Sequence, residues 1–171
     1  MAVTAALIVV HTFVEPRDLS SANGVVTMEV PGSWDDLTSI DAGQPYTAAD
    51  EHDEWTVPDL EAEDFLGDAH LSGWVSDAGD DVFTAVQNDL VATTCDQEGC
   101  LSRGTPTSTT VAGQPAVQQL LRHPGTKDYG SSSTLVVSIT KDETVVSTAI
   151  WWDEYVDLDT AKLLRSVSLT R

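Results

Sequence analysis

The sequence predicts an α+β protein in which helices cover an antiparallel sheet. Segments of alternating apolar and polar residues, typical of half-buried strands, recur along the chain. Short polar connections separate the later strands, which favours hairpins and therefore antiparallel pairing. Two segments have apolar residues at helical spacing. With 171 residues, of which 41% are hydrophobic, one domain with its own core is expected.

The chain begins with an apolar run, Met1 to Val10, that is too short to span a bilayer. No basic residue precedes Arg17, so the positive start of a signal peptide is missing. Two interpretations stay open. One is the end of an export or anchor helix, and the other is a first strand or a short buried helix. We expect residues 1–20 to be this segment with its linker, and residues 21–171 to be a single α+β domain.

The first strand is predicted over Gly24–Val30, with Val26, Met28 and Val30 on its buried face. Pro31-Gly32-Ser33 ends it, and Ser33 is expected to cap a short helical turn. Trp34, directly after this turn, is expected to fill a gap in the core. Residues 41–63 hold eight acidic side chains around two prolines and are expected to form an acidic loop.

The middle of the chain predicts a strand over Ala69–Val75 and a helix from Asp80 or Asp81 to about Thr94. The inner stripe of this helix is expected at helical spacing, from Val82, Phe83, Val86 and Leu90. Cys95 and Cys100 follow, with Gly99 between them. A small-loop disulfide in an oxidising compartment is favoured, and a metal pair is the alternative, although no further cysteine or nearby histidine completes a zinc site.

The last third predicts an antiparallel meander followed by a helix. Strands are expected over 105–111, 116–121, 134–140 and 144–151, with a turn at Ala112–Pro115. Asp157 or Asp159 can cap the last helix. Its inner face is expected to hold Leu158, Ala161 and Leu164, with Leu163 beside them.

Two short motifs carry a resemblance to the PsbP-like superfamily. One is Met28-Glu29-Val30-Pro31-Gly32-Ser33-Trp34, where a strand runs into a turn and a tryptophan. The other is the meander that starts at Val111-Ala112-Gly113-Gln114-Pro115-Ala116 and closes with a helix and Ser166-Val167-Ser168-Leu169. The carboxyl-terminal two-thirds also resembles small exported domains of actinobacteria. The resemblance implies an α/β/α sandwich over Val25–Leu169, a non-catalytic accessory role and no catalytic residues to transfer.

The charge excludes some partners. The 28 acidic residues against 8 basic ones give a formal net charge of −20, and the basic residues are scattered. Because nucleic acids and anionic membranes are bound through clustered Lys and Arg, neither is expected as a partner. A cationic partner, a divalent ion and a simple solvated shell are all compatible with this charge.

Aromatic residues are the best candidates for contact with a partner. Trp151 and Trp152 are adjacent on a predicted strand, so they point to opposite faces of the sheet. Asp153, Glu154 and Tyr155 follow them. An exposed aromatic ring edged by carboxylates suits a cationic or peptide ligand, with Trp74 as a further candidate. The alternative is that both rings are covered by helices.

Metal and catalytic sites have weaker patterns. Asp77, Asp80 and Asp81 surround a glycine turn and offer oxygen ligands for calcium, but they also fit a turn and a helix cap. Glu51-His52-Asp53-Glu54 is a second metal candidate. His70, with Ser72 beside it on the same predicted strand, is the best candidate for hydrolytic chemistry.

The sequence therefore predicts a non-enzymatic binding or accessory domain outside the cytoplasm, either secreted or membrane-anchored. Its expected partner is a protein or peptide, and no cofactor is expected unless calcium binds. A secreted acidic hydrolase and a calcium-stabilised surface domain are the alternatives.

Overall fold

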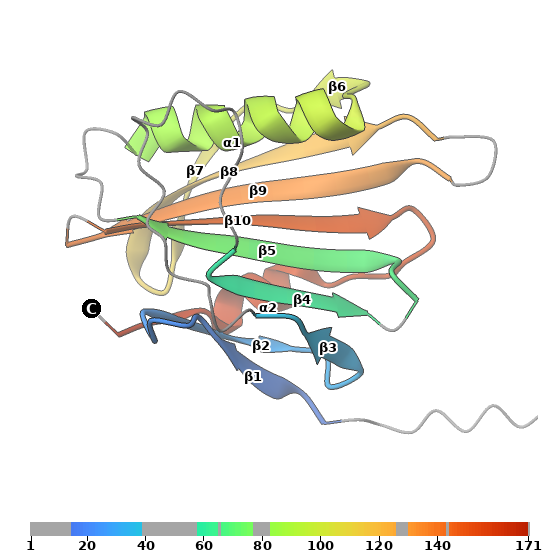
Figure 1. The fold of residues 1–171 in the computed structure, drawn as a ribbon. Coiled ribbons are helices and arrows are strands. Elements are labelled where there is room, and N and C mark those ends of the chain that lie inside the picture. Colours follow the sequence, from blue (N-terminus) through green and yellow to red (C-terminus); the bar gives the residue numbers. More distant parts are fainter. Residues whose placement is uncertain are drawn as a thin grey trace, which may run out of the picture.

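Two sheets and two helices make up the described part of the computed structural model, which comprises residues 15–38, 58–64, 66–76, 83–125, 130–142 and 144–170 (Figure 1). The larger sheet has the order β3-β4-β5-β10-β9-β8-β6, and β7 also pairs with β8. Its strands are β3 (Trp34–Asp36), β4 (Leu60–Asp64), β5 (Ala69–Ser76), β6 (Ser102–Arg103), β7 (Thr107–Val111), β8 (Gln114–His123), β9 (Ser132–Lys141) and β10 (Thr144–Asp153). The smaller sheet has the order β1-β2-β11, with β1 (Arg17–Ser20), β2 (Val26–Val30) and β11 (Ser168–Leu169).

Every strand pair is antiparallel, as the hairpin spacing predicts. The β7–β8 hairpin turns through Ala112 and Gly113, whose φ angles are 52° and 76°. Two successive residues with positive φ form a type I′ turn, which matches the twist of the two strands. The meander β8-β9-β10 is thereby confirmed.

The larger core lies between one face of the main sheet and the smaller sheet. Val137 and Ile139 of β9 and Ile150 of β10 supply the main sheet's side, each at most 1% exposed. Leu19 of β1 and Met28 of β2 supply the opposite side. Helix α2 (Thr160–Ser166) closes this core, because its Leu163 is buried there.

A second, smaller core lies on the other face of the main sheet, under helix α1 (Phe83–Glu98). Leu90, Val91 and Cys95 of α1 pack against Leu121 of β8 and Val136 of β9. The hydroxyl of Ser138, fully buried on β9, donates to Gln87 Oε1 of α1 at 2.6 Å and lies 2.8 Å from Ser147 Oγ. Figure 1 shows α1 on one side of the sheet and α2 with the β1–β2 hairpin on the other.

The predicted covering of both faces by helices holds only in part. Helix α1 covers one face, but the other face packs against a small sheet, with α2 contributing one short helix. The inner face of α2 is also corrected, because Leu163 is its buried residue, whereas Leu158 and Leu164 are half-buried and Ala161 is exposed. Asp159 caps α2 by accepting from the Lys162 amide, as predicted.

Two segments around the acidic loop differ from expectation. Trp34–Asp36 forms strand β3 paired with β4, and no helical turn follows Ser33. Leu60–Asp64 is strand β4, although residues up to Glu63 were expected in an acidic loop. It is a strand because Leu60 and Ala62 face the core while Glu61 and Glu63 point away. Trp34 is 4% exposed and lies in the larger core, as predicted. Helix α1 extends past Thr94, and short strand β6 was not expected.

Several predictions fall outside the described residues. They concern the apolar run Met1–Val10, most of the acidic loop, the start of α1 near Asp80 and Asp81, and the side chains of Val82 and Phe83 in its stripe. The rest of that stripe, Val86 and Leu90, is buried as predicted.

Asp59 connects the two sheets just before β4. Its side chain is 3% exposed and accepts from the Val75 amide at 2.7 Å, while its carbonyl accepts from the Ala22 amide at 3.0 Å. Burial raises the pKa of the Asp59 carboxyl above its ordinary value of 3.8, and the Val75 hydrogen bond opposes this increase. The folded state therefore holds the Asp59 proton more tightly than the unfolded chain does.

We predict that Asp59→Asn removes part of the pH dependence of stability. Because the folded pKa is raised, wild-type stability falls as pH rises from the unfolded value of 3.8 through the folded pKa. The asparagine does not titrate, yet it keeps an oxygen for the Val75 amide. In urea unfolding between about pH 4 and about pH 7, the difference in unfolding free energy should shift in favour of the variant as pH rises. A pH-independent difference would contradict the prediction.

Candidate functional site

The three candidate tryptophans lie on both faces of the main sheet, and all three are half-buried. Trp152 of β10 packs against the larger core, whereas Trp74 of β5 packs against the smaller core under α1. Trp151 shares the α1 side, and its Nε1–H donates to Ser132 Oγ at 3.0 Å. The two adjacent rings on β10 are thus divided between opposite faces. Each ring packs against other residues over at least part of its surface.

Tyr155 is the exposed aromatic residue of the candidate set, with 63% of its surface accessible. Its hydroxyl lies 2.7 Å from Asp68 Oδ1 and 2.9 Å from Asp153 Oδ2. Hydrogen bonds to these two carboxylates, Asp68 first, raise the pKa of the Tyr155 phenol. The ring is therefore held in one orientation, with its neutral form favoured and carboxylates at its edge.

The segment that follows β10, Glu154–Asp159, is called the acidic connector here. Its last three residues line a pocket of about 340 Å³. The wall of the pocket is largely apolar, and carboxylates with one ammonium group stand at the rim. The lining consists of Pro16, Glu29, Val30, Pro31, Asp157, Leu158, Asp159, Lys162 and Leu163.

The carboxylates at the rim of this pocket differ in whether they already have a hydrogen-bond or ion-pair partner. Asp159 caps α2 through Oδ1, and its Oδ2 lies 3.8 Å from Arg165 Nη2. Glu29 and Asp157 are exposed, and neither side chain has a hydrogen bond or ion pair with another residue in the described ranges. They are therefore available to an incoming cation.

Sequence reasoning missed this pocket, because its walls come from the start of β1, the end of β2 and the amino-terminal side of α2. One signal was present in the sequence. Glu29 occupies an outward position of β2, between inward-facing Met28 and Val30, and so had to be exposed. Nothing in the sequence alone places Glu29 beside Asp157.

The predicted calcium ligands Asp77, Asp80 and Asp81 lie outside the described residues, as does Glu51-His52-Asp53-Glu54. Among the residues that the structure describes, no group of three or more His, Cys, Asp or Glu side chains is arranged to hold a metal ion. Calcium binding therefore stays a prediction.

His70 joins two other polar residues on the face of the main sheet. Its Nε2 lies 3.0 Å from Glu61 Oε1 of β4, and its Nδ1 lies 3.5 Å from Ser72 Oγ. The residue types are those of a hydrolytic triad, but the serine contact is long. Strand β5 pairs with β4 on one side and β10 on the other, so the amides around Ser72 are engaged in the sheet. They are not available to stabilise an oxyanion, which hydrolysis of this kind requires.

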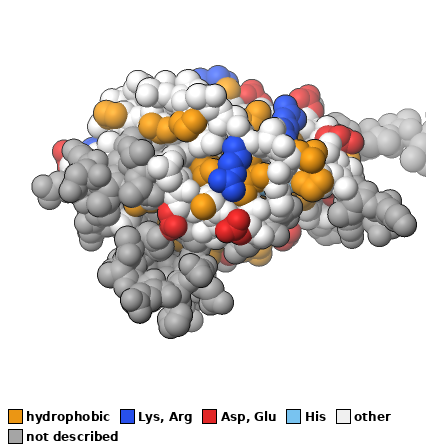
Figure 2. Space-filling model, turned by 90° about the horizontal axis from the view of Figure 1, so that it is seen from above, with side chains coloured by type: hydrophobic (Ala, Val, Ile, Leu, Met, Phe, Trp, Pro, Cys, Tyr) orange, Lys and Arg blue, Asp and Glu red, His pale blue; other side chains and the backbone are white. Residues whose placement is uncertain are grey.

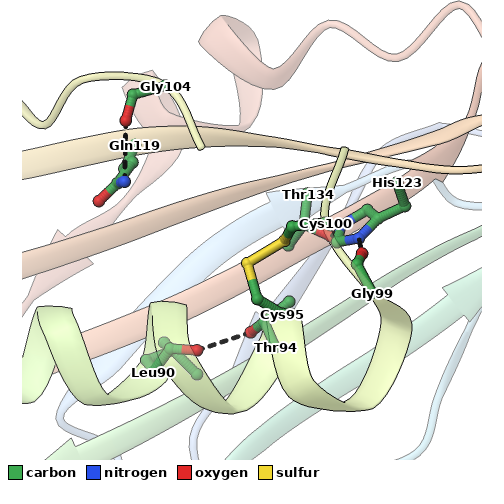
Figure 3. The surroundings of a disulfide bond; sticks show 9 residues. All are labelled: Leu90, Thr94, Cys95, Gly99, Cys100, Gly104, Gln119, His123 and Thr134. Carbon is green, nitrogen blue, oxygen red and sulfur yellow. Dashed lines mark hydrogen bonds between the residues drawn. A yellow bond between two sulfur atoms is a disulfide. The ribbon is translucent and has the colours of Figure 1, made fainter. Parts of the chain in front are cut away.

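The disulfide between Cys95 and Cys100 is present, as predicted (Figure 3). It joins the last turn of α1 to the residues before β6, across a Cα–Cα distance of 5.0 Å. Gly99 has a φ of 72°, a conformation that glycine adopts without strain. The Gly99 carbonyl accepts from Nδ1–H of the buried His123 at 2.6 Å, and Nε2 of His123 lies 2.8 Å from Thr134 Oγ1. The loop is thus tied to β8 and β9 as well as to the helix.

The structure has the PsbP-like fold. In this arrangement a long helix covers one face of the antiparallel main sheet, and the small sheet with its short helix covers the other face. The solution structure of cyanobacterial PsbP (CyanoP) from Synechocystis sp. PCC 6803 is similar to 97% of this chain and covers 97% of its own, with a TM-score of 0.56 and 15% identity. A crystal structure from Bacteroides thetaiotaomicron VPI-5482 is similar to 93% of this chain and 48% of that chain, with a TM-score of 0.47 and 8% identity.

Sequence comparison adds no family. No protein-family model matches the chain, and no curated protein matches it in sequence. The similarity to cyanobacterial PsbP thus shows the fold alone. In the described part of the chain, neither helix is long and apolar enough to cross a membrane.

We predict that Tyr155 titrates above the ordinary range of tyrosine. The phenolate would lie beside two carboxylates, so its formation is opposed in the folded state. Alkaline titration followed by tyrosinate absorbance should show one of the three tyrosines ionising last. Tyr155→Phe should abolish this last step and leave the earlier ones unchanged. If the titration step that Tyr155→Phe abolishes lies near the ordinary tyrosine pKa of about 10, the raised pKa of Tyr155 is contradicted.

We also predict that replacing both cysteines, Cys95→Ser with Cys100→Ser, destabilises the fold by about 2 kcal/mol. The estimate follows from the loop-closure entropy of a ring of about six residues. Thermal unfolding with and without a reducing agent is the measurement. Reduction should lower the midpoint of the wild-type protein to that of the variant and leave the variant unchanged. Equal midpoints for the oxidised wild-type protein and the variant would show that the disulfide adds no stability.

Proposed function

We propose that this chain is a non-catalytic binding or accessory domain that works outside the cytoplasm and binds a cationic segment of a protein or peptide. The observation that carries the proposal is the apolar pocket beside the acidic connector, with carboxylates at its rim. Its volume of about 340 Å³ lies within the range of ligand pockets.

The chemistry of the pocket fits a lysine or arginine side chain. Val30, Leu158 and Leu163 offer an apolar wall to the aliphatic stem of such a side chain. Glu29 and Asp157 at the rim offer charge-assisted hydrogen bonds to its cationic head. Tyr155, which the same connector carries, adds an exposed ring of the kind that attracts cations.

The charge of the whole chain and its disulfide support the same role. A net charge of −20 attracts a cationic partner from a distance and raises the association rate at low salt. The Cys95–Cys100 disulfide favours an oxidising compartment. The PsbP-like fold supports an accessory role rather than a catalytic one.

A pair of blocked peptides tests the pocket. One has Lys-Leu-Lys at its centre, and the other has uncharged norleucine in place of each lysine. The lysine peptide should bind the wild-type protein more tightly. In the variant Glu29→Gln with Asp157→Asn, we expect its Kd to rise by about threefold to tenfold, as loss of two partly exposed ion pairs implies. Isothermal titration calorimetry measures these constants.

A charge-matched control separates the pocket from the overall negative field. Asp35→Asn with Asp96→Asn removes two exposed carboxylates on β3 and α1, away from the pocket lining. This variant should bind the lysine peptide nearly as tightly as the wild-type protein does. If both double variants weaken binding equally, attraction is diffuse and the pocket is not the site.

A further inference from the structure

The strand β7 is an outer edge of the main sheet and is solvent-exposed. Its pairing partner is β8, and Thr107, Ser108 and Thr110 are all exposed. Because the two-residue turn at Ala112 and Gly113 closes on a hydrogen-bonded pair, the pairs along the hairpin alternate. Ser108 and Thr110 therefore direct their backbone N–H and C=O groups outward. Pro115, which has no N–H, lies opposite Thr110, as this alternation requires.

The other edges are protected against pairing with another chain. Charged side chains and short length are the usual protection for an edge strand. In the described residues, β3 carries Asp35 and Asp36, β1 carries Arg17 and Asp18, and β6 and β11 each have only two residues. The five residues of β7 are Thr-Ser-Thr-Thr-Val, without a charge.

The surroundings of β7 also lack the acidic character of the chain. Between Gly99 and Lys141 the sequence contains a single acidic residue, Asp128, although the chain has 28. The same segment contains four basic residues, Arg103, Arg122, Lys127 and Lys141. An approaching carboxylate therefore meets few like charges from this segment of the chain, and on the α2 side Asp159 Oδ2 lies 3.8 Å from Arg165 Nη2.

A cavity of about 450 Å³ lies beside the β7–β8 hairpin, where the hairpin faces α2. The hairpin contributes Thr109, Val111 and Gln118, and α2 contributes Ala161, Leu164 and Arg165. Side chains alternate along a strand, so those of an added strand that fall beside Thr109 and Val111 would share this face of the sheet. They would meet a small apolar surface on α2 and the guanidinium of Arg165.

We propose that β7 docks an extended segment of a partner protein, which adds to the main sheet as a further strand and directs a carboxylate toward Arg165. The outward backbone groups at Ser108 and Thr110 supply hydrogen bonds that do not depend on sequence, as in other cases of strand addition. The α2 side supplies selectivity for alternating β-branched and acidic side chains. This surface differs in chemistry from the acid-rimmed pocket, and its occupant carries the opposite charge.

Two blocked heptapeptides test the proposal, Thr-Val-Thr-Glu-Thr-Val-Thr and the same peptide with lysine in place of the central glutamate. Peptide binding should slow amide exchange at Ser108 and Thr110, measured by NMR. The glutamate peptide should bind more tightly than the lysine peptide. Arg165→Glu should reverse this order, and since the Arg165 side chain is 69% exposed, the variant should fold normally.

A matched pair of variants tests the backbone contact. Thr110→Pro removes an outward N–H without removing a hydrogen bond to β8, whereas Thr110→Val keeps the N–H and changes only the side chain. Thr110→Pro should raise the Kd of both peptides by at least about threefold, as expected for one lost hydrogen bond. Thr110→Val should bind as the wild-type protein does. The NMR spectrum of each variant establishes that it is folded.

Four results would overturn the proposal. They are no binding at the solubility limit of the peptides, protection of amides elsewhere than on β7, equal binding by the two Thr110 variants, and an unchanged peptide preference in Arg165→Glu. A wild-type dimer that Thr110→Pro converts to a monomer, measured by light scattering, would identify a second copy of this chain as the occupant instead. The Glu29→Gln, Asp157→Asn variant should bind the heptapeptides normally, so the two proposals fail separately.

Discussion

Burial of the central strands on both faces is the constraint on which the rest of the structure depends. In β9, Val137 and Ile139 enter the larger core, while Val136 and Ser138, which alternate with them, are buried under α1. The buried Ser138 has hydrogen-bond partners in Gln87 of α1 and Ser147 of β10, which fixes the helix at one position on the sheet. Because packing occupies both faces at the centre, the surfaces left for partners lie at strand ends and sheet edges.

The two candidate surfaces follow from this constraint and from an uneven distribution of charge. The acid-rimmed pocket lies where the chain leaves β10 and enters α2, and its rim carries Glu29 and Asp157. The β7 edge lies in the segment from Gly99 to Lys141, which holds one acidic residue. A net charge of −20 therefore does not describe the whole surface. Figure 2, which shows the α1 side, has uncharged and apolar side chains between scattered acidic and basic ones.

The sequence predicted the elements that show a regular pattern in their own residues. It missed those that form only by pairing or packing with a segment distant in the sequence. The hairpins of β8, β9 and β10 follow from alternation and short polar connections. Strand β4 also alternates, with Leu60 and Ala62 inward, but its acidic residues favoured a loop. Strand β3 exists because Trp34–Asp36 pairs with β4, which no local pattern shows. In α2, Leu163 is the residue buried against the larger core. The pocket was missed for the same reason, since its walls are distant in sequence.

Helix α2 joins the two candidate surfaces, because opposite sides of it line them. Asp159, Lys162 and Leu163 face the acid-rimmed pocket, and Ala161, Leu164 and Arg165 face the cavity beside β7. The 3.6-residue period of the helix produces this division. Leu163 holds α2 in the core, and the Ser166 hydroxyl accepts from the Glu29 amide at 2.9 Å, so the helix is fixed between both surfaces. The contact between Asp159 and Arg165, at 3.8 Å, links one lining residue of each surface. Substitution of Asp159 would therefore disturb the α2 cap and both surfaces together, whereas Glu29 and Asp157 each report on the acid-rimmed pocket alone.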